Sequence, residues 1–158
     1  MKNTALNDEV SAVFQQYADR GVFRGFRASP GPRGRVEYRF LWLLRQPMHA
    51  VFDSKRGVLT FAALFPGVQA SSDMVTGFRA LVAARTARGQ PGHKRIDARR
   101  AHVSCAIRRG DWSLVVKIRG ANHEYAVRKA LNLINELFLS LHDAYPDYLI
   151  ERFGLSTE

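Results

Sequence analysis

The chain has 158 residues, a net charge of +10, a hydrophobic fraction of 46% and a single cysteine. This length suits one domain with a self-supporting core, and the hydrophobic fraction excludes a disordered chain. One cysteine excludes an intramolecular disulfide, and no apolar stretch approaches the ~20 residues of a transmembrane helix. The first eight residues lack the pattern of a signal peptide, so we expect a cytoplasmic protein without membrane contact.

The positive charge is concentrated in the middle of the chain. Residues 20–119 carry twenty basic and five acidic side chains, whereas both flanking segments are net acidic. A basic block of this kind indicates an acidic partner. Arginine outnumbers lysine nineteen to five, which a GC-rich gene also produces without selection for a ligand. The charge is therefore either functional or compositional, and the sequence leaves both readings open.

The first periodic segment predicts an amphipathic helix over residues 7–20. Apolar residues recur there at helical spacing from Val10 to Ala18, and Gly21 stands where a C-terminal cap would. Residues 22–34 hold three glycines and two prolines, which favours a loop. That loop carries four residues suited to binding: Phe23, Arg24, Phe26 and Arg27.

Three predicted strands follow, because the hydrophobic period changes to two. Alternation over residues 36–44 predicts a strand that turns its even positions inward and Arg39 outward. Residues 48–53 and 58–65 predict the next two strands, with Gly57 as a left-handed residue in their connection. The run 58–65 is apolar on both faces, which is typical of a central strand.

The next part of the chain predicts a second helix and then a hairpin. The helix covers residues 72–88, with Ser72 as its N-cap and Gly89 at its end. For the hairpin we predict a type II′ turn at Gly110 and Asp111. This turn sets the register of the two strands, which pairs Ile107 with Leu114, Cys105 with Val116, and Val103 with Ile118.

A long last helix is predicted over residues 122–144. It ends before Pro146, because the residue preceding proline disfavours the helical conformation. Leu133 and Leu139 lie beside its main apolar stripe, where they either widen the core contact or form a homodimer contact. Residues 147–153 predict a short terminal helix.

Together these elements predict a single α+β domain over residues 1–158. Its core spans residues 7–144, and residues 145–158 form the short helix and tail. The order α-βββ-α-ββ-α predicts a two-layer sandwich, with an antiparallel five-stranded sheet and helices on one face. This order resembles that of the class I type III secretion chaperones and the YbjN-like proteins. The resemblance implies a chaperone-like protein that dimerises and holds an extended segment of a partner, although those chaperones are typically acidic and this chain is basic.

No catalytic constellation is recognisable in the sequence. The five histidines are not spaced as metal ligands, and Cys105 falls on the inward face of its strand, where cysteine usually serves as a small apolar filler. We therefore expect no enzyme, no metal site and no cofactor.

The outer face of the predicted sheet mixes cations with apolar side chains. This candidate surface comprises Arg39, Leu41, Leu43, Arg100, His102, Val115, Lys117 and Arg119. Apolar groups beside cations on an uncovered sheet favour a protein-binding surface, either for an acidic, amphipathic segment or for a second copy of the chain. We expect a homodimer that acts as a chaperone-like or adaptor-like protein.

Two other functions fit parts of the pattern. The same cations could contact phosphates of a nucleic acid, with Phe23 and Phe26 as stacking partners for unpaired bases. Alternatively, a small ligand could bind between the helices and the sheet, in a pocket lined by Tyr38, Trp42 and Trp112.

Overall fold

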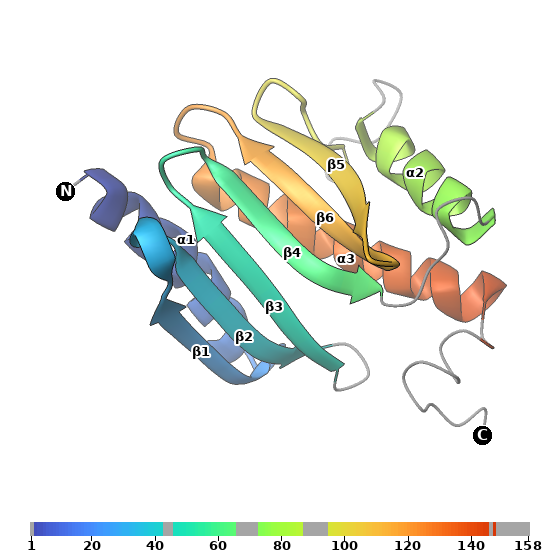
Figure 1. Cartoon of the computed structure of the whole chain (residues 1–158), viewed down its shortest axis with the longest axis horizontal. Coiled ribbons are helices and arrows are strands. Elements are labelled where there is room, and N and C mark those ends of the chain that lie inside the picture. Colours follow the sequence, from blue (N-terminus) through green and yellow to red (C-terminus); the bar gives the residue numbers. More distant parts are fainter. Residues whose placement is uncertain (1, 43–45, 66–72, 87–94, 146, 148–158) are drawn as a thin grey trace.

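The computed structural model describes residues 2–42, 46–65, 73–86, 95–145 and 147. In this part of the chain, three helices accompany one antiparallel sheet of six strands, in the order β1-β2-β3-β4-β6-β5 (Figure 1). The elements are α1 (Lys2–Asp19), β1 (Arg24–Pro30), β2 (Val36–Trp42), β3 (Gln46–Asp53), β4 (Val58–Phe65), α2 (Asp73–Thr86), β5 (Ala101–Arg108), β6 (Asp111–Ile118) and α3 (His123–Ala144).

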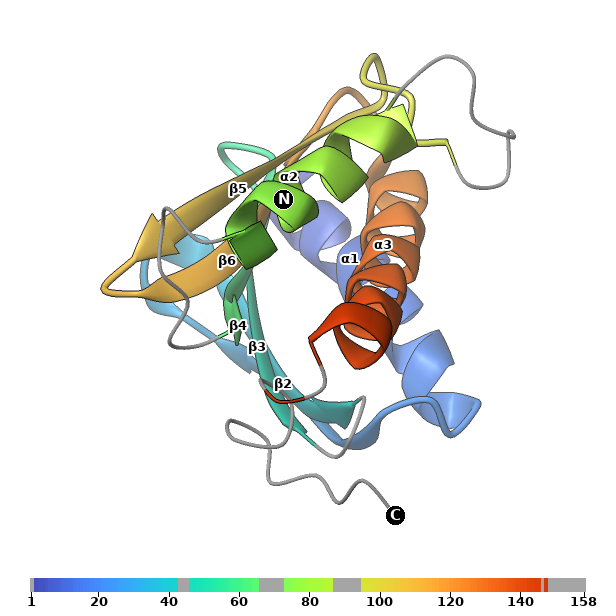
Figure 2. The same ribbon diagram turned by 90° about the vertical axis from the view of Figure 1, so that its right-hand side faces the viewer.

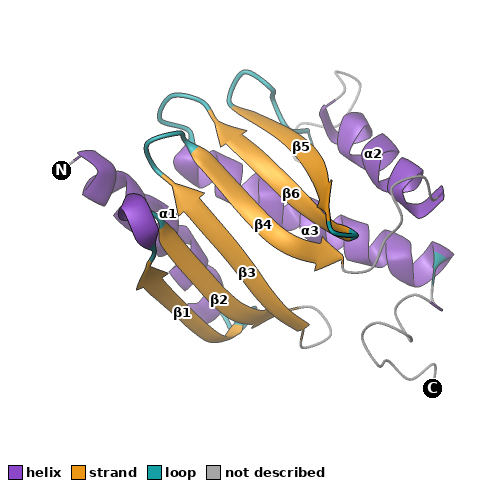
Figure 3. Ribbon diagram, viewed as in Figure 1, coloured by secondary structure: helices purple, strands orange, loops and turns teal. Residues whose placement is uncertain are grey.

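The helices lie on one side of the sheet. Figure 2, which views the molecule from its side, shows α1, α2 and α3 against one face, and Figure 3 shows strands in front of helices. No described element covers the other face. The predicted α+β fold with helices on one face of an antiparallel sheet is thus confirmed, but the sheet has six strands instead of five.

Aromatic rings fill the space between the two layers. Phe14 of α1 lies 4.5 Å from the ring centroid of Tyr38 and also packs against Phe23 and Phe40. At the other end of the sheet, Phe65 stacks on Phe78 of α2 at 4.6 Å and contacts rings from β6 and α3. Burial of a large aromatic ring removes roughly 150–250 Å² of surface from water. The ring clusters around Phe14 and Phe65 therefore contribute most of the hydrophobic stabilisation of the domain.

The additional strand is β1, which occupies part of the segment predicted to be a loop. Its glycine and proline are tolerated because β1 is an edge strand, where one row of backbone N–H groups needs no partner. Gly25 adopts a φ of +61° where the register shifts between Arg24 and Arg27. That irregularity interrupts the alternation of side chains, so the period-two pattern that marks a strand is hidden in the sequence.

The middle strands follow the prediction closely. β4 has the predicted bounds and lies in the interior of the sheet, and Gly57 has the expected positive φ, +64°. An irregularity between Phe61 and Phe65 explains why β4 is apolar on both faces. There Ala63 has a φ of +48° and its N–H donates to the Ser113 hydroxyl at 2.9 Å, which places both Leu64 and Phe65 in the core.

The predicted register of the β5–β6 hairpin is wrong by two residues. Arg108 pairs with Asp111, so the two turn residues are Arg109 and Gly110. Their φ values, 54° and 81°, are both positive, as a type I′ turn requires. Val103 consequently faces Val116, and the other inward pairs shift in the same way. A shift of two leaves every side chain on its predicted face, since side chains alternate with a period of two.

The helices differ from the prediction mainly at their ends. The first begins at Lys2, five residues earlier than predicted, and α3 begins at His123 and ends at Ala144 as expected. Leu133 is buried in the core, whereas Leu139 is 58% exposed, so only Leu139 is available for a contact with a second copy. Leu43, Ser72 and Gly89 lie outside the described residues, as do residues 148–153 of the predicted terminal helix.

Candidate binding surface

The uncovered face of the sheet has a floor of small side chains. Large residues of β4 and β6, such as Phe61 and Leu114, point toward the helices, so their neighbours in sequence point outward. Seven outward residues of β3, β4, β5 and β6 are short and uncharged. They are Val51, Val58, Thr60, Ala62, Ala106, Ser113 and Val115, and they line a trough of about 590 Å³.

The trough follows the strands and has charged groups at both ends. Arg35, Asp53 and Arg56 stand at the end where β3 turns into β4, and Arg109 and Asp111 stand at the β5–β6 turn. The eight residues of β4 correspond to a length of about 26 Å at about 3.3 Å per residue. The trough can therefore accept an elongated object with an apolar surface and charged ends.

Asp53 is held as a carboxylate among cations at its end of the trough. Arg35 Nε lies 3.3 Å from Asp53 Oδ2, and the backbone N–H groups of Lys55 and Arg56 donate to Oδ1. Burial raises the pKa of Asp53, but the hydrogen bonds from Arg56 and Arg35 and the charge of Arg35 outweigh it and lower the pKa. Asp53 is thus negative at neutral pH and its charge is already balanced.

A second hollow, of about 600 Å³, lies over β1, β2 and β3. It is lined by Gly25, Phe26, Arg27, Arg39, Phe40, Leu41, Pro47, Met48 and His49. Arg27 is directly opposite Arg39 in the ladder, and Arg39 is directly opposite His49. Leu41 is 39% exposed beside them. This hollow shares no lining residue with the trough.

The β5–β6 side of the face carries a third group of cations. His102 is opposite Lys117, whose Nζ donates to the backbone oxygen of Arg56 at 2.9 Å. Arg119 is exposed. Arg100, which we expected on the same face, instead lies with its guanidinium 3.6 Å from the ring centroid of Tyr125 and donates to Asn122. Arg100 is therefore tied to the start of α3 and is not a free group of the surface.

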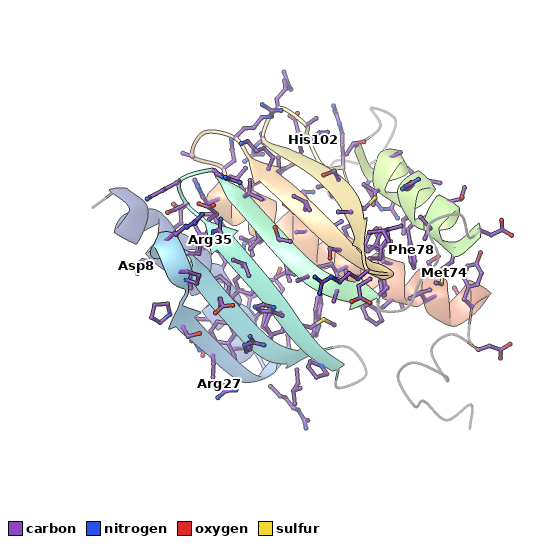
Figure 4. All side chains as sticks on the ribbon, in the orientation of Figure 1. Asp8, Arg27, Arg35, Met74, Phe78 and His102 are labelled. Carbon is purple, nitrogen blue, oxygen red and sulfur yellow. The ribbon has the colours of Figure 1, made fainter. Side chains whose placement is uncertain are left out.

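The predicted surface residues thus separate into distinct places. Arg39 and Leu41 belong to the hollow, and Val115 belongs to the trough. Lys117 is opposite Val58 at the Arg56 end of the trough. His102 lies on β5, beside the trough (Figure 4). The prediction missed the trough floor contributed by β3 and β4. The outward positions of the runs 48–53 and 58–65 contain the signal, because Val51, Thr60 and Ala62 are short while their inward neighbours are large.

The rings expected to stack on nucleic-acid bases are not presented on the outer face. Phe23 is only 3% exposed and lies in the core, and Phe26 is half-buried with its ring packed near Phe14 and Tyr38. Arg24 and Arg27 are exposed, as expected. Among the described residues, no aromatic side chain is strongly exposed. The expectation that Phe23 and Phe26 serve as stacking partners is therefore wrong for Phe23 and weakened for Phe26.

The three aromatic residues expected to line a small-ligand pocket are core residues. Tyr38, Trp42 and Trp112 are all buried. The hydroxyls of Tyr38 and Ser11 share a hydrogen bond of 2.7 Å, and burial is the main cause that raises the pKa of Tyr38 to about 12. These side chains hold the layers together, so the structure gives them a packing role in place of a pocket.

Cys105 is half-buried beside Arg79, and burial raises the pKa of its thiol although Arg79 opposes this shift. Within the described ranges, no three His, Cys, Asp or Glu side chains are grouped as metal ligands. In the same ranges, no helix has the length and apolar character needed to cross a membrane.

Comparisons with known proteins find no relative. No family model matches the chain, and neither do any of the curated proteins or solved structures. The resemblance to secretion chaperones in the order of elements therefore stays a prediction, and functional inference depends on the surface itself.

Proposed function

We propose that the protein is a non-enzymatic binding protein that holds an acidic, amphipathic segment of a partner protein on its uncovered sheet face. The observation that carries the proposal is the trough, whose floor is uncharged and mainly apolar. Its ends carry three arginines, Arg35, Arg56 and Arg109, and two aspartates, Asp53 and Asp111. An apolar floor on an uncovered sheet face, bordered by charged groups, supports the assignment of an interaction site.

Charge favours an acidic partner over a neutral one. Asp53 is balanced by Arg35 and Arg56, while Arg109 makes no ion pair within the described part of the chain. The whole chain carries a net charge of +10. Such a surface attracts acidic segments over a distance and speeds their association. The apolar floor then contributes the affinity that charge alone does not provide.

The length of the trough fits a short element of secondary structure. About 26 Å accommodates roughly eight residues of extended chain, or roughly seventeen residues of helix at 1.5 Å per residue. An amphipathic segment of either kind presents one apolar side to the floor, and its acidic side chains can reach the arginines at both ends.

The test uses a fluorescein-labelled, 18-residue amphipathic peptide with glutamates on its polar side. Anisotropy should show saturable binding that weakens as salt is raised, and a peptide with lysine in place of glutamate should not bind. Val115→Asp places a charge on the trough floor and should reduce affinity at least tenfold. Val22→Asp, at an exposed valine away from the sheet face, is the matched control and should bind normally. Equal binding by both variants would refute the proposal.

A second measurement separates a partner protein from a second copy. Light scattering after size exclusion should give the same mass for the wild type and for Val115→Asp, because the trough is not the contact between copies. A wild-type dimer that Val115→Asp converts to a monomer would instead identify the trough as a homodimer contact. The trough floor offers no aromatic ring on which bases could stack, so we expect no tight binding of single-stranded DNA there. Tight DNA binding that is lost in Val115→Asp would contradict the proposal.

A further inference from the structure

The hollow over β1–β3 contains a row of basic side chains on neighbouring strands. Arg27, Arg39 and His49 occupy directly opposed positions in the ladder. Opposed residues on one face of a sheet have Cβ atoms about 4.5–5.5 Å apart, and like charges placed in this way repel. All three side chains line the same hollow, and Figure 4 labels Arg27 at the outer strand of the sheet.

The repulsion between the two arginines of this row is not relieved within the described part of the chain. Across the residues that the structure describes, neither Arg27 nor Arg39 makes an ion pair or a side-chain hydrogen bond. Glu37 is the only acidic residue of β1 and β2, and its Oε1 lies 3.1 Å from His49 Nε2. Among the described residues, the two opposed arginines therefore have no counter-charge, which is the arrangement that an anion would complete.

Apolar groups form the rest of the hollow. Leu41 and Pro47 line it on the same face as the cations, and Leu41 is one of the few large apolar side chains that the described surface exposes. The irregularity at Gly25 leaves open space there, since a Cβ built on this glycine would meet no atom within 4 Å. A volume of about 600 Å³ is within the range of small-molecule sites, roughly 300–1,000 Å³.

We propose that this hollow binds a small organic phosphate monoester. The phosphate lies between Arg27 and Arg39, and the organic group lies against Leu41 and Pro47, which are opposite each other in the ladder. A phosphate monoester carries a charge of about −1.5 to −2 at neutral pH, which matches two guanidinium groups, whereas a carboxylate balances only one. Guanidinium groups also bind phosphate oxygens in a bidentate manner. The site is separate from the trough and does not depend on the function proposed for it.

The experiment is calorimetric titration at low salt with phenyl phosphate, using phenyl sulfate and inorganic phosphate as comparison ligands. Phenyl phosphate should bind with one-to-one stoichiometry. Phenyl sulfate, which has the same shape but a single charge, should bind at least tenfold more weakly. Inorganic phosphate should also bind at least tenfold more weakly, because it lacks the apolar group. Equal affinity for all three ligands would overturn the proposal, as would the absence of saturable binding by phenyl phosphate.

Matched variants distinguish this site from a general effect of positive charge. Arg39→Gln and Arg27→Gln should each reduce affinity for phenyl phosphate at least tenfold. Arg119→Gln removes the same charge from an exposed position outside the hollow and should change affinity less than twofold. Equal losses of affinity in all three variants would refute the assignment.

A second measurement needs no ligand. Arg39→Gln should raise the melting temperature at low salt relative to Arg119→Gln, because it relieves the repulsion between Arg39 and Arg27. Peptide binding in the trough should be unaffected by Arg27→Gln.

Discussion

The two faces of the sheet are built from the same strands but from different side chains. On the inner face, Phe61 and Leu114 are buried beneath the helices. On the outer face, their neighbours Thr60, Ala62 and Val115 are short and line an open trough. Because side chains alternate along a strand, one stretch of sequence determines both surfaces.

Because of this difference, the inner face stabilises the fold and the outer face is available for binding. The inner face removes large rings from water and accounts for most of the hydrophobic stabilisation, whereas the outer face contributes little to stability. Substitutions on the two faces should therefore affect different measurements, even when they are adjacent in the chain.

The largest expected effect is on the inner face. Phe61→Ala removes a buried ring and leaves a cavity, so the free energy of unfolding should fall by about 3–5 kcal/mol. Thr60→Ala, one residue away on the outer face, should cost less than about 1 kcal/mol. Urea unfolding followed by circular dichroism measures both changes. Similar losses for the two variants would contradict the separation of the faces.

The next effect comes from the buried hydroxyl of Tyr38. Its pKa is about 12 in the folded state and about 10 in an unfolded chain, so the neutral phenol stabilises the fold fully below pH 10. This contribution, about 3 kcal/mol, is lost as pH rises from about 10 to about 12. Tyr38→Phe should show a shallower fall in unfolding free energy over that range. Parallel pH profiles for the two proteins would show that Tyr38 does not titrate as described.

Ser113 is an outer-face residue that nevertheless contributes to stability, so it tests how far the two faces differ. Its hydroxyl accepts the hydrogen bond of the Ala63 N–H, which has left the regular ladder. Ser113→Ala should lower the free energy of unfolding by about 1–3 kcal/mol, because that N–H loses its partner. Ser104→Ala is the control, since Ser104 is exposed on the neighbouring strand β5. Chemical denaturation that ranks Ser104→Ala as the more damaging change would be incompatible with this role.

The smallest effect concerns the charge at the end of the trough. The lowered pKa of Asp53 means that its carboxylate stabilises the fold above the unfolded pKa of about 3.9. The contribution is lost as pH falls through the folded pKa, and for a pair near the surface it should stay below about 1 kcal/mol. Asp53→Asn should flatten the stability profile below about pH 4. A profile that matches the wild type would show that Arg35 and Arg56 do not stabilise this carboxylate.

Strong alternation and clear caps made most of the fold predictable. β4 and α3 were predicted almost to the residue, and the inward positions of β2, β5 and β6 were assigned correctly. The edge strand β1 was missed because its irregularity at Gly25 hides the alternation. The hairpin register was wrong because Arg109 adopts a left-handed conformation that arginine rarely takes, which the sequence does not signal.

The candidate sites were predictable in part for the same physical reasons. Alternation alone placed Arg39, Leu41, Val115 and Lys117 on the outer face. The opposed pair Arg27 and Arg39 depends on the pairing of β1 with β2, so it could not be predicted once β1 was read as a loop. Arg100 was misplaced because its contact with Tyr125 joins residues far apart in the sequence.

The alternation of side chains in the β5–β6 hairpin limits which shifts of its strand pairing the core can accept. A slip of the β5–β6 pairing by two residues moves each side chain along the sheet but keeps it on its own face. A slip of one residue would turn Trp112 and Leu114 out into water. Changes at this turn are therefore compatible with the core when they shift the pairing by an even number of residues.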